Sequence, residues 1–171
     1  MKKILSVSRI LLAILLLASF PVVGQAAEPI KLGAVEPLSG TFKNIGDRYL
    51  EGVQYAAKVL NRQGGVLGRK IEVIPIDSEL KPDVTTRKAT ALILKDQVKF
   101  FCGGTGSSVG AAMATVAEQN NAIMFSYGMD AASLTGAKCS KNFFRPGTNT
   151  DMHSYALAAY VAKSKFKKVY C

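Results

Sequence analysis

Short apolar runs alternate with amphipathic segments between residues 30 and 125. Four runs rich in β-branched and other apolar residues predict strands at residues 30–35, 70–76, 98–102 and 122–125. The segments between them predict helices at residues 47–62, at residues 82–96, and from Ser107 or Ser108 to residues 120–121. Continuously apolar strands separated by helices are typical of a parallel sheet with both faces covered. The pattern therefore predicts an α/β fold with a doubly wound, mainly parallel sheet.

The first 26 residues follow a different pattern. Positive charges at Lys2, Lys3 and Arg9 precede an apolar run over residues 10–23, and small residues follow before residue 27. This order predicts a signal peptide that is cleaved on export. The apolar run is shorter than the about 20 residues that a membrane helix needs, so no membrane span is expected after cleavage. We expect a periplasmic product.

The chain of 171 residues has a formal net charge of +10, which raises the question of nucleic-acid binding. Part of that charge belongs to the predicted leader, and the rest is scattered. The one tight cluster, at Lys163, Lys165, Lys167 and Lys168, contains no Arg. We interpret it as a solvated face and expect no nucleic-acid partner.

The three cysteines, Cys102, Cys139 and Cys171, are spaced unlike any metal-binding motif, so no metal is expected. In an oxidising compartment two of them could pair, or Cys102 could be a buried free thiol. The glycines at residues 103–106 lack the Lys-Ser/Thr of a phosphate-binding loop and the third Gly of a dinucleotide fingerprint. No cofactor is expected.

Loops at the carboxyl ends of the strands are the expected ligand site. With the strand order 2-1-3-4, the loops over residues 37–46 and 103–108 part at the point where the winding reverses. The first loop contains Ser39 and Gly40, and the second ends at a helix start with two serines. A helix N-terminus with hydroxyls beside it favours a carboxylate, although Ser107 or Ser108 could instead cap its own helix.

Several motifs resemble the leucine/isoleucine/valine-binding protein family. They are GAVEPLSG at residues 33–40, Gly46, Glu51-Gly52, and NRQGGVLGRK at residues 61–70. The resemblance continues at Asp77, Pro82, Gly103-Gly104, Ser107-Ser108, Leu134-Thr135 and Phe144-Arg145. It therefore covers nearly all of the chain after the predicted leader.

The resemblance implies a type I periplasmic binding protein, in which two α/β lobes joined by crossing strands close on a small solute. Such proteins deliver the solute to the permease and ATPase subunits of an ABC importer. The implied division is a signal peptide at 1–26, an N-terminal ligand-binding lobe at 27–146, and a crossing segment with the start of a truncated second lobe at 147–171. Residues 143–146 resemble the first crossing strand, residues 151–163 the opening helix of the second lobe, and residues 168–171 the beginning of its first strand.

The resemblance also implies where the solute binds. Ser107, with Gly106 and Ser108, lies where family members bind a ligand carboxylate. Residues 127–130 lie where amino acid binders place small residues and a hydroxyl, which makes Tyr127, Gly128 and Asp130 candidates beside Ser39 and Gly40.

Two of these candidates have alternative interpretations. Asp130 stands where a hydroxyl is usual, so its carboxylate could favour an ammonium, amide or hydroxyl donor, or it could cap a short helix. Tyr127 could contact an apolar ligand group or pack within the lobe. The expected ligand is a small polar solute such as a branched-chain amino acid or an amide.

Two other classes of function share this fold. An enzyme is not expected, because the chain has no nucleophile elbow, no cofactor fingerprint and no carboxylate pair with a histidine partner. A periplasmic ligand sensor that feeds a signalling partner is the alternative to transport.

Overall fold

A single five-stranded parallel sheet forms the centre of the molecule in the computed structural model, which describes residues 27–166 and residue 168. Its strands are β1 (Ile30–Glu36), β2 (Ile71–Asp77), β3 (Phe100–Gly103), β4 (Ile123–Ser126) and β5 (Phe143–Phe144), in the spatial order β2-β1-β3-β4-β5. This order confirms the predicted doubly wound α/β fold. The predicted signal peptide lies outside the described residues.

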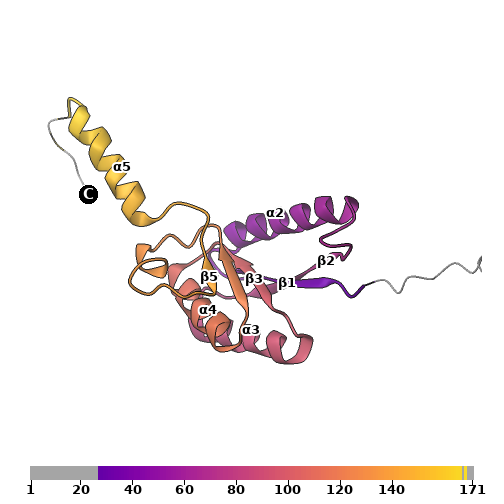
Figure 1. The fold of residues 1–171 in the computed structure, drawn as a ribbon. Coiled ribbons are helices and arrows are strands. Elements are labelled where there is room, and N and C mark those ends of the chain that lie inside the picture. Colours follow the sequence, from indigo (N-terminus) through magenta and orange to yellow (C-terminus); the bar gives the residue numbers. More distant parts are fainter. Residues whose placement is uncertain (1–26, 167, 169–171) are drawn as a thin grey trace, which may run out of the picture.

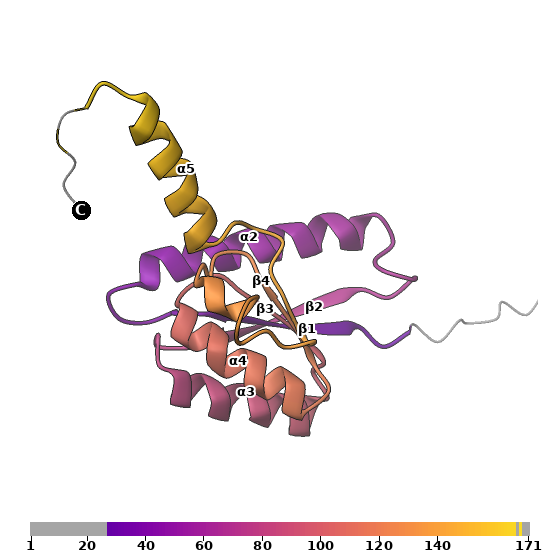
Figure 2. The ribbon, with the colours of Figure 1, turned by 60° about the vertical axis from the view of Figure 1, so that its left-hand side comes forward.

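Helices cover both faces of the sheet (Figures 1 and 2). They are α2 (Lys43–Arg62), α3 (Pro82–Asp96) and α4 (Ser107–Gln119). The remaining helix, α5 (Thr150–Lys163), projects away from the sheet, and the 3₁₀ turn η1 (Ala132–Leu134) lies between β4 and β5. Figure 2 shows α2 on one face and α3 beside α4 on the other. Within the described residues, no helix combines the length and hydrophobicity that a membrane span needs.

The helix boundaries follow local chemistry. α3 begins with Pro82, whose fixed φ suits a first helical position, and ends at Gln97 with a left-handed φ of 56°. α2 begins at Lys43, four residues before the predicted start, and Lys43 forms an ion pair of 2.6 Å with Asp47 one turn later. The first turn of α2 carries polar residues that the apolar period does not mark, so the sequence pattern missed it.

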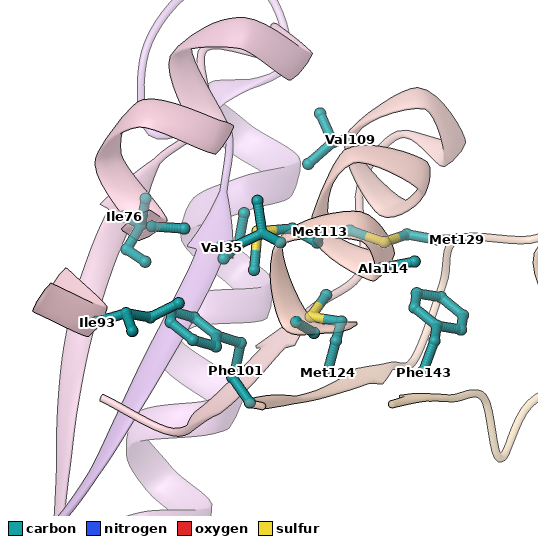
Figure 3. Close-up of a cluster of buried hydrophobic side chains, with 14 of the residues drawn as sticks. Val35, Ile76, Ile93, Phe101, Val109, Met113, Ala114, Met124, Met129 and Phe143 are labelled. Atoms are coloured by element: carbon teal, nitrogen blue, oxygen red, sulfur yellow. The ribbon is translucent and has the colours of Figure 1, made fainter. Parts of the chain in front are cut away.

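The hydrophobic core lies between the sheet and the α3–α4 layer (Figure 3). Val35, Phe101, Met113 and Met124 are fully buried there. Gly33 is required beneath Phe101, because a Cβ at that position would lie 2.5 Å from the ring. Each such buried side chain stabilises the fold by about 1.5–3 kcal/mol relative to its exposed state.

The segment after β4 adds a fifth strand to the sheet. Phe143–Phe144, in the segment predicted to cross to a second lobe, pair in parallel with Met124–Phe125 and form the edge of the same sheet. α5 then leaves the sheet, and none of its residues is buried (Figure 1). The division at residue 146 stays a prediction. Lys168 lies in no helix or strand, and the rest of the predicted strand at 169–171 lies outside the described residues.

Candidate functional site

The candidate site lies at the carboxyl edge of the sheet, where β1 and β3 are neighbours. The chain leaves β1 for β2 on one side and returns to β3 on the other, so the winding reverses between them. Val35 and Gly103 are register partners at this edge. The loops after β1, β3 and β4 therefore meet at this edge, where a ligand crevice is expected because the winding reverses there.

A buried carboxylate ties these three strands together. Glu36, the last residue of β1, is 0% exposed. Its Oε1 accepts hydrogen bonds from the backbone N–H of Gly104 at 2.7 Å and from the hydroxyl of Tyr127 at 2.5 Å. Its Oε2 accepts a hydrogen bond from the hydroxyl of Thr105 at 2.6 Å. One side chain thus joins the end of β1 to the loops after β3 and β4.

Burial dominates the titration of this network. It raises the pKa of Glu36, and the hydrogen bonds from Thr105, Tyr127 and Gly104 oppose the rise. Burial, followed by the hydrogen bond to Glu36, raises the pKa of Tyr127. Burial and the neighbouring Glu36 raise the pKa of the Cys102 thiol to about 12. Tyr127 and Cys102 are therefore neutral at pH 7.

Two glycines let the Tyr127 ring lie against the backbone. A Cβ at Gly104 would lie 2.3 Å from Cε2 of Tyr127, and a Cβ at Gly128 would lie 2.8 Å from the carbonyl oxygen of Gly104. The ring of Tyr49, from α2, is tilted by 50° against that of Tyr127, with centroids 5.1 Å apart. This geometry is favourable for an aromatic pair. Tyr127 therefore packs in the lobe and remains half-buried beside the crevice.

The start of α4 places the serine candidates. Gly106 is the N-cap with φ 86°, and neither Ser107 nor Ser108 makes a capping hydrogen bond, so their interpretation as caps is wrong. Instead, Oγ of Ser107 accepts a hydrogen bond from the N–H of Ala131 at 3.1 Å. Its own hydrogen is still able to donate, and Ser108 is exposed. The first N–H groups of a helix also lack intrahelical acceptors, so this end suits an acceptor ligand.

Ser39 and Gly40 lie in the loop after β1. The Ser39 side chain bonds to Asp77 at the end of β2, and the N–H of Leu38 donates to the same carboxylate at 2.8 Å. Burial raises the pKa of Asp77, but bonds from Ser39, Glu79 and Leu38 and the charge of Lys88 bring it below its usual value. The Leu38–Asp77 bond thus holds the loop, and Gly40 makes the turn with φ 72°.

The segment after β4 is held by Arg145. Its guanidinium donates to the carbonyl oxygens of Met129 at 3.1 Å and Ala131 at 2.8 Å, and to the hydroxyl of Thr135. Asp130, between the two carbonyls, does not cap η1, because Ala131 is its N-cap and no side-chain bond is made. Among the described residues the Asp130 carboxylate has no hydrogen-bond partner, and it is half-buried.

The structure brings most of the predicted residues to one place. Ser107 contacts the segment after β4 through its bond to Ala131, and this segment contains Tyr127, Gly128 and Asp130. Glu36 was missed as a site residue, although a lone charge ending a continuous apolar run was a usable signal. In the part of the chain that the structure describes, no three His, Cys, Asp or Glu side chains form a metal-binding group.

Comparison with known proteins identifies a family model that matches most of the chain. The family model described as periplasmic binding protein matches residues 29–171. The chain belongs to the periplasmic binding protein family. The predicted resemblance is therefore confirmed, and the proteins of this family that resemble the chain are named as binding proteins rather than enzymes.

Three similar proteins illustrate how closely the chain matches its relatives. The Leu/Ile/Val-binding protein homolog 3 of Brucella melitensis is 26% identical over 162 residues, 94% of this chain and 44% of that protein. The closed structure of a leucine-, isoleucine-, valine-, threonine- and alanine-binding protein from Brucella ovis is 29% identical with a TM-score of 0.67, over 72% of this chain and 33% of that one. A solute-binding protein of R. palustris in complex with benzoate is 25% identical with a TM-score of 0.70, over 79% and 37%. The chain thus spans less than half the length of these relatives.

Proposed function

We propose that this chain forms the first ligand-binding lobe of an extracytoplasmic solute-binding protein of an ABC importer. The observation that carries the proposal is the meeting of the loops after β3 and β4 at the strand switch point. There, the open N-terminus of α4 and the Ser107 hydroxyl meet the segment after β4. Backbone N–H groups and a hydroxyl are the donors that recognise a carboxylate.

The ligand class follows from the groups around that crevice. The Tyr127 ring offers an apolar surface, while the unpaired Asp130 carboxylate would accept an ammonium or amide donor. Two relatives are named for leucine, isoleucine and valine, and another was solved with benzoate. Each of these ligands carries a carboxylate on an apolar group. We therefore propose a small carboxylate-bearing solute, such as a branched-chain amino acid, or a related amide.

The predicted export signal would bring the chain to the compartment where an importer collects its solute. A signal peptide over residues 1–26 would place the chain in the periplasm, and the permease and ATPase of an importer would be its partners. A second lobe would close over the solute and complete the site. The length of the relatives supports this, since each matched region is less than half of the whole protein.

Isothermal calorimetry with L-leucine, benzoate and an uncharged control, isobutanol, tests the proposal on the purified chain. One wall of a site gives weak affinity, so millimolar dissociation constants are expected for the two carboxylates, with no heat for isobutanol. Substituting Asp130→Asn should weaken L-leucine more than benzoate. Equal heats for all three probes would overturn specific binding.

A further inference from the structure

The buried position of Glu36 calls for a reason beyond folding. Taking a carboxylate out of water is costly without a cation, and within the described residues Glu36 forms no ion pair. The positions before it, Ala34 and Val35, are apolar and equally buried. An apolar residue at 36 would serve the core at lower cost.

The partners of Glu36 all belong to the crevice. Two lie in the turn after β3, Gly104 and Thr105, and one follows β4, Tyr127. The two hydroxyl bonds are short, at 2.6 and 2.5 Å. Because these donors are engaged, a solute meets the ring of Tyr127 rather than its hydroxyl, and the Gly104 N–H is not free to bind an anion.

We propose that Glu36 is the positioning residue of this crevice. It fixes the Tyr127 ring and the Gly104–Thr105 turn as a preformed wall, and its charge disfavours any solute that sets a carboxylate against that turn. The solute carboxylate is directed instead to the start of α4, at Ser107. This inference rests on the proposed solute-binding function and deepens it by assigning the residue that positions the wall of the site.

Proton NMR of the full chain tests, without any ligand, whether Glu36 positions the Tyr127 ring. The Tyr127 hydroxyl proton should exchange slowly and resonate downfield, and Tyr127→Phe should remove that signal. Glu36→Gln should shift the signal upfield or abolish it, whereas Glu72→Gln, at an exposed position of β2, should leave it in place. An unchanged signal in folded Glu36→Gln, or no such signal in the wild type, would overturn the proposal.

A second measurement keeps the test decisive if Glu36→Gln does not fold. The carboxyl ¹³C resonance of Glu36 should differ between the wild type and Tyr127→Phe, because the variant removes one donor and leaves Glu36 itself unchanged. Identical carboxyl shifts in these two proteins would show that no such bond exists and would overturn the assignment.

The proposed effect of Glu36 on solute selectivity is tested with three probes that share one carbon skeleton: L-leucine, L-leucinamide and 4-methylpentanoate. Removing the Glu36 charge should favour the anionic probe over the cationic one, so Glu36→Gln should raise the ratio of the affinity for 4-methylpentanoate to that for leucinamide roughly tenfold. An unchanged ratio would overturn the selectivity assigned to Glu36. If no probe binds the wild type, the proposed function fails with it, while the hydroxyl signal still decides the positioning role.

Discussion

The hydroxyl of Tyr127 donates to the carboxylate of Glu36 across 2.5 Å, although the two residues are separated by 91 positions in the sequence. The bond fastens the loop after β4 to the end of β1. Because Glu36 also holds the turn after β3, the wall of the crevice is built before any solute arrives. Preformed walls reduce the ordering cost of binding.

Removing the Ser107 hydroxyl should weaken solute binding. Ser107→Ala loses a donor to a charged ligand, and a loss of about 1–3 kcal/mol in binding free energy is expected. Calorimetry with L-leucine measures it. Thr115→Ala is the matched control, since Thr115 is exposed on the same helix and bonds only to Ala111. Equal affinity in Ser107→Ala and the wild type would remove Ser107 from the site.

The glycines at 106 and 52 should respond oppositely to alanine. Gly106 has φ 86° and a Cβ there would lie 2.7 Å from Cδ1 of Leu80, so Gly106→Ala should lower the free energy of unfolding by at least about 1 kcal/mol. Gly52 is exposed within α2 with open space around it, so Gly52→Ala should raise the free energy by about 0.5–1 kcal/mol. Urea denaturation measures both. A stabilising Gly106→Ala would contradict the backbone geometry.

Neighbouring phenylalanines of β3 should differ in their contribution to stability. Phe101 is fully buried in the core, and Phe101→Ala should cost about 3–5 kcal/mol. Phe100 is 39% exposed on the opposite face, so Phe100→Ala should cost clearly less. The two free energies of unfolding, compared by urea denaturation, give the answer. Equal losses would mean that the sheet faces are assigned wrongly.

Glu36 should make the folded chain relatively more stable in mild acid. Its pKa is raised above the ordinary 4.5 in the folded state, so its favourable contribution is complete below 4.5 and is lost as the pH rises through the folded value. The groups facing it, Tyr127 and Cys102, stay neutral in this range because their pKa values are also raised. From pH 7 down to pH 4.5, the free energy of unfolding of wild type minus that of Glu36→Gln should therefore increase.

The difference between the two proteins also cancels the opposite trend of Asp77. Its pKa is lowered from 3.8, so its contribution is present above 3.8 and is lost only as the pH falls further. Urea denaturation at several pH values supplies the comparison. A difference that shrinks on acidification would mean that Glu36 is not destabilised by burial.

The sequence pattern predicted the fold because each strand and most helices carry their own signal. The four longer strands are mainly apolar, and α3 is bounded by Pro82 and Gln97. The start of α2 was placed late because its first turn is polar. The two residues of β5 are too few to show a period, and they pair with β4 only through tertiary structure.

The site was harder to predict because its contacts are long-range. Gly106 and Ser107 were marked by a strand, glycines and a helix start in one short segment. The partner of Ser107 is the backbone of Ala131, 24 residues away, and nothing local indicates it. The role of Glu36 likewise depends on Tyr127. Local chemistry therefore pointed to the loops at this edge of the sheet, but not to the bonds that join them.

We expect the solute to bind at the carboxyl edge of β1, β3 and β4. Titrating the ¹⁵N-labelled chain with L-leucine and following backbone amide shifts tests it most directly, because NMR detects even weak binding. We predict saturable shifts concentrated at residues 104–109 and 127–131, with no comparable change in α3. Absence of saturable shifts at millimolar L-leucine, or shifts centred elsewhere on the lobe, would contradict the account.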